Sequence, residues 1–89
     1  MRSTLQTAGY YLRDITTHAI KKVGETTQGI ARYTKQYYKD NNIYMDIQEF
    51  GTKAEMRLWE HEQLGEYILK YGARPDLNYQ VDRAVNVLR

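Results

Sequence analysis

Apolar and small residues recur every three or four positions through the first half of the chain, and this spacing constrains the fold more than any other feature. An α-helix has 3.6 residues per turn, so such a pattern places one stripe along one helix face. Ser3-Thr4-Leu5-Gln6 has the capping-box form that precedes helices. The spacing therefore predicts a helix over 3–39, with its stripe at Leu5, Ala8, Leu12, Ile15, Ala19, Val23, Thr26, Ile30, Thr34 and Tyr37. Whether Gly24 and Gly29 break this helix stays open, because each glycine costs roughly 1 kcal/mol relative to alanine.

Two further helices are predicted. Asp40-Asn41-Asn42 is a turn signal, and a second apolar stripe follows it over 43–71. Gly72 and Pro75 are typical of a helix end. A short third helix is expected over 77–88. The expected fold is all-α, a long antiparallel helical hairpin with a short C-terminal helix in one domain over 1–89.

Composition argues against several activities. The chain has no cysteine, which excludes thiolate metal sites and cysteine nucleophiles. The sequence His61-Glu62-Gln63-Leu64-Gly65 starts like a zincin motif but has no second histidine. No phosphate-binding glycine loop and no transmembrane-length apolar run occurs in the sequence. We therefore expect no enzyme activity, no catalytic residues, no cofactor and no bound metal.

The stretch from Glu55 to Leu77 resembles a helix of ferritin-like proteins, because it is rich in acids, contains a histidine and ends in a Gly-x-x-Pro-like turn. This resemblance would imply a carboxylate metal site, which is one alternative function. Diiron bundles of that family use Glu-x-x-His motifs. Here Leu58, not a glutamate, lies three residues before His61. The favoured interpretation of the acids is an edge of the second helix that meets a basic edge of the first.

A second apolar face on the 43–71 segment predicts contact with a partner. Aromatic residues and methionine are enriched at protein interfaces. The long helices and this face together predict a small structural or accessory subunit of a larger multi-protein assembly. A basic, acid-poor start suggests a mitochondrial respiratory-type complex, inside the cell, and a homo-oligomer is also compatible. The candidate partner interface is Met45, Met56, Trp59 and Tyr67.

The charges are distributed unevenly along the chain. Residues 1–39 contain seven Lys/Arg and two acids, whereas residues 40–66 contain two Lys/Arg and seven acids. The two segments are expected to face each other or a charged partner. Basic side chains interleaved with tyrosines also suit nucleic-acid contacts. A basic nucleic-acid-binding or virion packaging protein is thus the other alternative, with candidate polyanion contacts at Lys21, Lys22, Arg32, Lys35 and Lys39.

Overall fold

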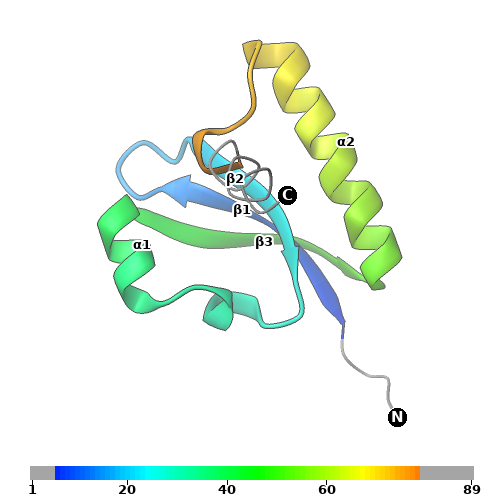
Figure 1. Ribbon diagram of the computed structural model, residues 1–89, viewed down its shortest axis with the longest axis horizontal. Helices are drawn as coiled ribbons and strands as arrows, with labels where there is room; N and C mark the ends of the chain where they lie inside the picture. The colour runs from blue at the N-terminus through cyan, green and yellow to red at the C-terminus, as the bar shows by residue number, and fades with distance from the viewer. Residues whose placement is uncertain (1–5, 79–89) are drawn as a thin grey trace, which may run out of the picture.

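The computed structural model describes residues 6–78, which form a three-stranded antiparallel sheet with helices on both of its faces (Figure 1). This is an α+β fold. In chain order the elements are β1 (Thr7–Asp14), β2 (Ile20–Thr26), the short 3₁₀ helix η1 (Gly29–Arg32), α1 (Lys35–Asn41), β3 (Ile43–Gly51) and α2 (Lys53–Tyr71).

A tight loop over 15–19 joins β1 to β2. The Asp14 carboxylate accepts hydrogen bonds from the backbone N–H groups of Thr16 and Thr17, which turns the chain immediately after β1. These bonds, that of Thr17 first, lower the pKa of Asp14. His18 completes the reversal with a left-handed φ of 65°. The β1–β2 hairpin therefore reverses direction at a polar loop that lies in the middle of the predicted first helix.

The strand order β2-β1-β3 places β1 in the centre and leaves β2 and β3 at the two edges. Both neighbours run antiparallel to β1. Gly9 pairs with Glu49 and Tyr10 pairs with Ile47, so Gln48 has no partner on β1. Such an extra residue is a β-bulge, which bends an edge strand and increases its twist.

The hydrophobic core lies on one face of the sheet. Successive strand residues point to opposite faces, and Tyr10 and Leu12 share the core face with Ile43 of β3. Leu77 joins them from the segment that follows α2, which Figure 1 shows returning to β2. The partly buried residues packed against this cluster come from the 33–38 region and β3, and are Tyr33, Tyr37, Tyr38 and Met45.

Helix α2 packs on the other face of the sheet. Thr52 caps its start in a reciprocal capping box with Glu55. The absence of a side chain at Gly9 lets the Trp59 ring lie against β1, because a Cβ there would be 2.6 Å from a ring carbon. Tyr11 packs beside the same ring, with centroids 5.7 Å apart. This face of the sheet is closed over β1 and β2 by one helix.

The predicted all-α hairpin is wrong. Residues 7–14 and 20–26 are strands within the predicted first helix, and 43–51 is a strand within the predicted second. The three-to-four spacing in 1–39 combines residues from both faces of the sheet, because Leu12 lies on the core face whereas Val23 lies with Tyr11 on the face of α2. Ala8, Tyr10 and Leu12 have a period of two, which is the strand period.

The predicted end of the second helix is confirmed. Gly72 has a left-handed φ of 81° and its N–H bonds to the Ile68 carbonyl, so it is a helix C-cap. Asn42 likewise ends α1 with a φ of 54°, within the predicted turn. The Ser3 capping box lies outside the described residues, as does the predicted helix over 77–88 beyond residue 78.

Candidate functional site: the open edge of β3

The outer edge of β3 is the most prominent unpartnered feature in the described part of the chain. Its nine residues pair with β1 on one side. On the other side, no backbone hydrogen bond joins β3 to any residue of 6–78. An edge strand of this kind offers a row of free N–H and C=O groups to another strand.

The two faces of this edge differ in chemistry. Ile47 and Phe50 lie on the core face but are 38% and 59% exposed, because they extend past the residues that cover Tyr10 and Leu12. Asp46 and Glu49 lie on the opposite face. The Asp46 carboxylate accepts a hydrogen bond from Arg13 Nε at 2.6 Å, whereas Glu49 is exposed. An added strand would therefore meet apolar side chains on one face and acidic ones on the other.

The opposite edge of the sheet is covered at its middle residue, Val23. The side-chain amide of Asn78 accepts a hydrogen bond from Val23 N–H at 2.7 Å and donates one to Val23 C=O at 3.0 Å. These are the two bonds that a residue of a neighbouring strand would make. Asn78 is buried, with Pro75 buried on the same segment. Within residues 6–78, Val23 on the β2 edge is therefore bonded by Asn78, whereas the outer edge of β3 has no backbone partner.

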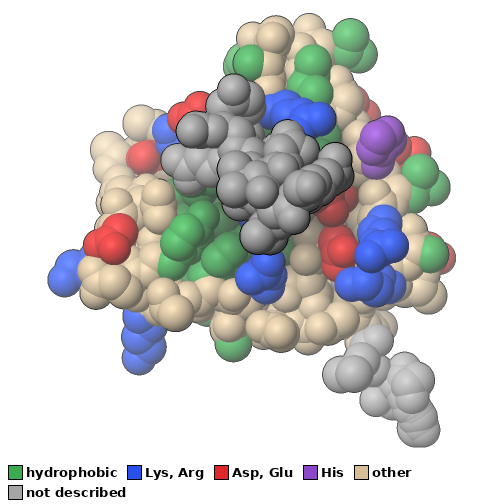
Figure 2. All heavy atoms as spheres, in the orientation of Figure 1, with side chains coloured by type: hydrophobic (Ala, Val, Ile, Leu, Met, Phe, Trp, Pro, Cys, Tyr) green, Lys and Arg blue, Asp and Glu red, His purple; other side chains and the backbone are tan. Residues whose placement is uncertain are grey.

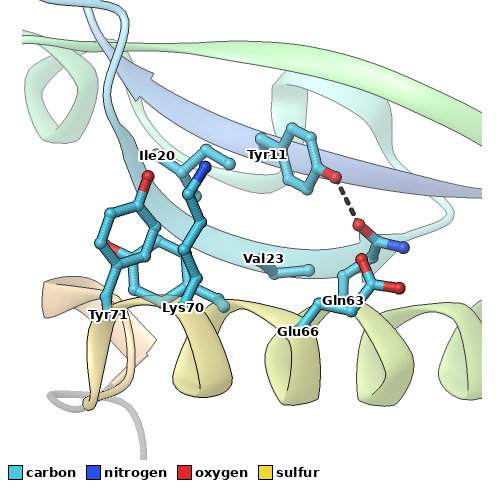
Figure 3. A pocket seen from close by; sticks show the side chains of 8 residues that line it. Tyr11, Ile20, Val23, Gln63, Glu66, Lys70 and Tyr71 are labelled. Atoms are coloured by element: carbon cyan, nitrogen blue, oxygen red, sulfur yellow. Dashed lines mark hydrogen bonds between the residues drawn. The ribbon is translucent and has the colours of Figure 1, made fainter.

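A shallow groove runs between α2 and the sheet (Figure 3). Its volume is about 160 Å³, and its walls include Tyr11, Val23 and the last turns of α2. Tyr11 donates a hydrogen bond to Gln63 across it at 2.5 Å. The Lys70 ammonium group lies over the Tyr71 ring, 5.3 Å from its centroid (Figure 3). Two of the polar side chains that line the groove therefore contact other lining residues.

A tyrosine cluster supports the core face. The hydroxyl groups of Tyr10 and Tyr33 are 2.5 Å apart, and Tyr37 stacks on Tyr33 with a centroid distance of 4.7 Å. Burial raises the pKa of Tyr10, and the neighbouring Tyr33 raises it further. The two hydroxyl groups are hydrogen-bonded to each other. This arrangement explains part of the nine tyrosines as packing rather than as chemistry.

The structure does not bring the predicted interface residues together into one exposed patch. Met45 packs on the core face and Trp59 on the opposite face. Met56 is buried beside Gly51, and Tyr67 contacts Tyr71 at the far end of α2. Met45 belongs to β3 and so lies next to the open edge. The role of these four residues in partner binding stays a prediction.

The predicted polyanion contacts are dispersed. Lys21 pairs with Asp76 at 3.5 Å, and Lys22 is buried. Arg32 lies over the Tyr33 ring, whereas Lys35 and Lys39 are on the exposed surface of α1. On the face drawn in Figure 2, basic and acidic side chains are interspersed rather than gathered into a basic surface. This arrangement does not favour nucleic acid as the partner.

Charge pairing between the two halves of the chain occurs, but with partners that the sequence did not indicate. Arg13 pairs with Asp46, and Glu25 accepts Lys53 and Arg57 at 3.5 and 3.8 Å. Glu55 instead caps α2.

Within residues 6–78, no group of three or more His, Asp or Glu side chains lies close enough to hold a metal ion. His61 is exposed, and His18 contacts the Tyr44 hydroxyl. The ferritin-like alternative required a helical bundle, which this sheet replaces. None of the helices in this part of the chain is long and apolar enough to cross a membrane.

Sequence reasoning missed the residues of the open edge, namely Ile47, Glu49 and Phe50. The available signal was the alternation of Ile43, Met45 and Ile47, which is typical of a strand. The helical interpretation instead places Ile43 and Ile47 in the apolar stripe and Met45 on the opposite helix face. Comparisons with known proteins add no relative, since the chain matches no protein-family profile, no curated protein and no solved structure.

Proposed function

We propose that this chain is a small non-enzymatic accessory subunit. It binds a partner protein by pairing the outer edge of β3 with a strand of that partner. The observation that carries the proposal is the contrast between the two sheet edges. Asn78 bonds the outward-facing N–H and C=O groups of Val23 on β2, whereas the outer edge of β3 has no backbone partner within the described residues. Strand addition to an exposed edge is a common mode of peptide recognition. The assembly itself and a mitochondrial location stay predictions from the sequence.

The chemistry of the edge indicates the partner. Apolar side chains on one face of the incoming strand would cover Ile47 and Phe50. Lysine or arginine on its other face would meet Glu49 and the Asp46–Arg13 pair. A partner segment that alternates apolar and basic residues is therefore preferred. A second copy of β3 is a poorer partner, because it would bring its own acids to the same edge.

A direct test uses a capped nine-residue peptide that alternates valine and lysine, the Val/Lys peptide, matched to the length of β3. We expect a Kd on the order of 10–100 µM by fluorescence anisotropy, because one strand buries less than a standard interface of ~1,600 Å². A peptide that alternates valine and glutamate, the Val/Glu peptide, should bind more weakly. Equal affinity for both peptides would contradict the proposed preference for basic residues in the partner strand.

Variants of the protein locate the contact. Phe50→Ser should weaken Val/Lys binding about tenfold, or ~1.4 kcal/mol, with little change in stability because Phe50 is exposed. Ile30→Ser removes an equally exposed apolar residue from η1 and is the matched control. Glu49→Lys should shift preference toward the Val/Glu peptide. If Ile30→Ser weakens binding as much as Phe50→Ser, the site is not at β3.

A further inference from the structure

Lys22 on β2 is buried without a charged partner in contact. It is 6% exposed, and its ammonium group lies 5.3 Å from the centroid of the Tyr33 ring. Its ammonium group makes no hydrogen bond or salt bridge with any residue of 6–78. Lysine is almost never fully buried unless it is paired, because removing the ammonium group from water is costly. The cation–π contact with Tyr33 compensates only part of this cost.

Lys22 lines a cavity of about 200 Å³ between β2, α2 and the segment that follows α2. Arg32 and Arg74 contribute two further cations to its walls. Arg32 is held over the Tyr33 ring at 4.9 Å, so the same ring positions both Arg32 and Lys22. Cationic groups therefore converge on this cavity from β2, η1 and the 72–78 segment.

Two carboxylates also line the cavity, and neither neutralises Lys22 by direct contact. Glu25 is already paired with Lys53 and Arg57 of α2. Glu60 is partly buried, and its burial, followed by the charge of Glu25, raises its pKa. A carboxyl group of raised pKa takes up a proton readily when an anion binds nearby, and it can then donate a hydrogen bond. The cavity thus combines cations with a potential acidic donor.

We propose that this cavity binds a small phosphate-bearing molecule through Lys22 and Arg32. A phosphate group carries close to two negative charges at neutral pH, which two cations can balance, whereas a single carboxylate would leave one of them uncompensated. The volume exceeds that of inorganic phosphate and leaves room for a small organic group. This site lies at β2 and is independent of the edge of β3.

The test measures binding of inorganic phosphate and of glycerol 2-phosphate by isothermal titration calorimetry, with acetate and sulfate at matched ionic strength. We expect the phosphate monoester to bind at least tenfold more tightly than acetate. Tighter binding of the monoester than of inorganic phosphate supports an organic ligand, and the reverse supports phosphate itself. Absence of heat with both phosphates up to 10 mM, or equal affinity for acetate, would overturn the proposal.

Lys22→Met removes the charge and keeps the length of the side chain. It should abolish phosphate binding while the chain still melts cooperatively, because methionine keeps the apolar packing of the buried Lys22 stem. Lys39→Met on exposed α1 is the matched control and should bind phosphate as the wild type does. If Lys39→Met weakens binding as strongly as Lys22→Met, phosphate associates with the general surface and the cavity is not its site.

Discussion

Asn78 replaces a neighbouring strand at β2 with a single side chain. Its amide presents one acceptor and one donor at the spacing of a backbone N–H and C=O pair, and both Val23 groups are satisfied. The residue thereby fixes the 75–78 segment against the sheet and places Leu77 in the core. This one polar side chain covers the middle of the β2 edge.

Asn78→Asp tests this role. The carboxylate has no N–H to donate, so the buried Val23 carbonyl loses its partner and a charge is placed in a buried site. We expect a loss of about 1–3 kcal/mol in the free energy of unfolding, measured by urea denaturation. Gln36→Ala removes an exposed hydrogen bond to Asp40 and should change it by less than ~0.5 kcal/mol. Similar losses in the two variants would show that the Asn78 amide has no special role.

Glu60 gives the fold a pH dependence. Its folded-state pKa is raised above the ordinary value of 4.5, so ionisation of Glu60 destabilises the folded chain. This contribution to stability is complete below pH 4.5 and is lost as pH rises through the folded-state pKa. The charged groups around it are Glu25, Lys22, Arg57 and His61.

Glu60→Gln should therefore melt at a higher temperature than the wild type at pH 7, and the difference should vanish near pH 4. Glu62→Gln on the same helix is exposed and serves as the control, with His61 present in both variants. Thermal melts by circular dichroism at several pH values measure the effect. A constant difference across this pH range would mean that Glu60 does not titrate with a raised pKa.

At the scale of the elements, the sequence predicts helix ends better than it predicts strands. A glycine followed shortly by a proline, as Gly72 is by Pro75, indicates a helix end regardless of which structure precedes the helix. Thr52-x-x-Glu55 is also a capping box and marks the start of α2. The apolar stripe over 43–71 instead predicted a helix that starts at residue 43. β3 reads as helix because Ile43, Ile47 and Phe50 are also three or four apart.

The hydrophobic pattern does not predict the β1–β2 hairpin, for a different reason. Its loop depends on the Asp14 side chain and on a left-handed His18, neither of which appears in a hydrophobic pattern. The burial of Lys22 was unpredictable as well, since lysine usually marks the exposed face. The edge of β3 and the Lys22 cavity both depend on which strands pair, and local spacing does not contain that information.

The edge of β3 has two features that protect it from self-pairing. Gln48 forms a bulge, and Glu49 places a charge on an exposed position. Glu49→Val should remove the charge and increase self-association at high micromolar concentration, measured by size-exclusion chromatography with light scattering. Glu62→Val on α2 adds an equally apolar residue away from the edge. Equal association of the two variants would indicate general stickiness instead of strand pairing.

At the scale of the whole molecule, the described residues form a small sheet with one closed and one open edge. A short chain buries a thin core, and such cores are often completed by a partner. In this molecule α2 covers β1 and β2 on one face, and the tyrosine cluster covers the other. The outer part of β3, with Phe50 at one end, stays exposed at the edge of this sheet. The central claim is that a partner strand completes the sheet there.

Hydrogen exchange of backbone amides, resolved by NMR with and without the Val/Lys peptide, tests that claim most directly. In the free chain, amides of β3 that point away from β1 should exchange quickly, whereas Val23, bonded to Asn78, should be protected. Bound peptide should protect alternate amides of β3 and leave those of β2 unchanged. Protection at β2 or in the groove of α2, or none at all on β3 despite binding, would contradict the account.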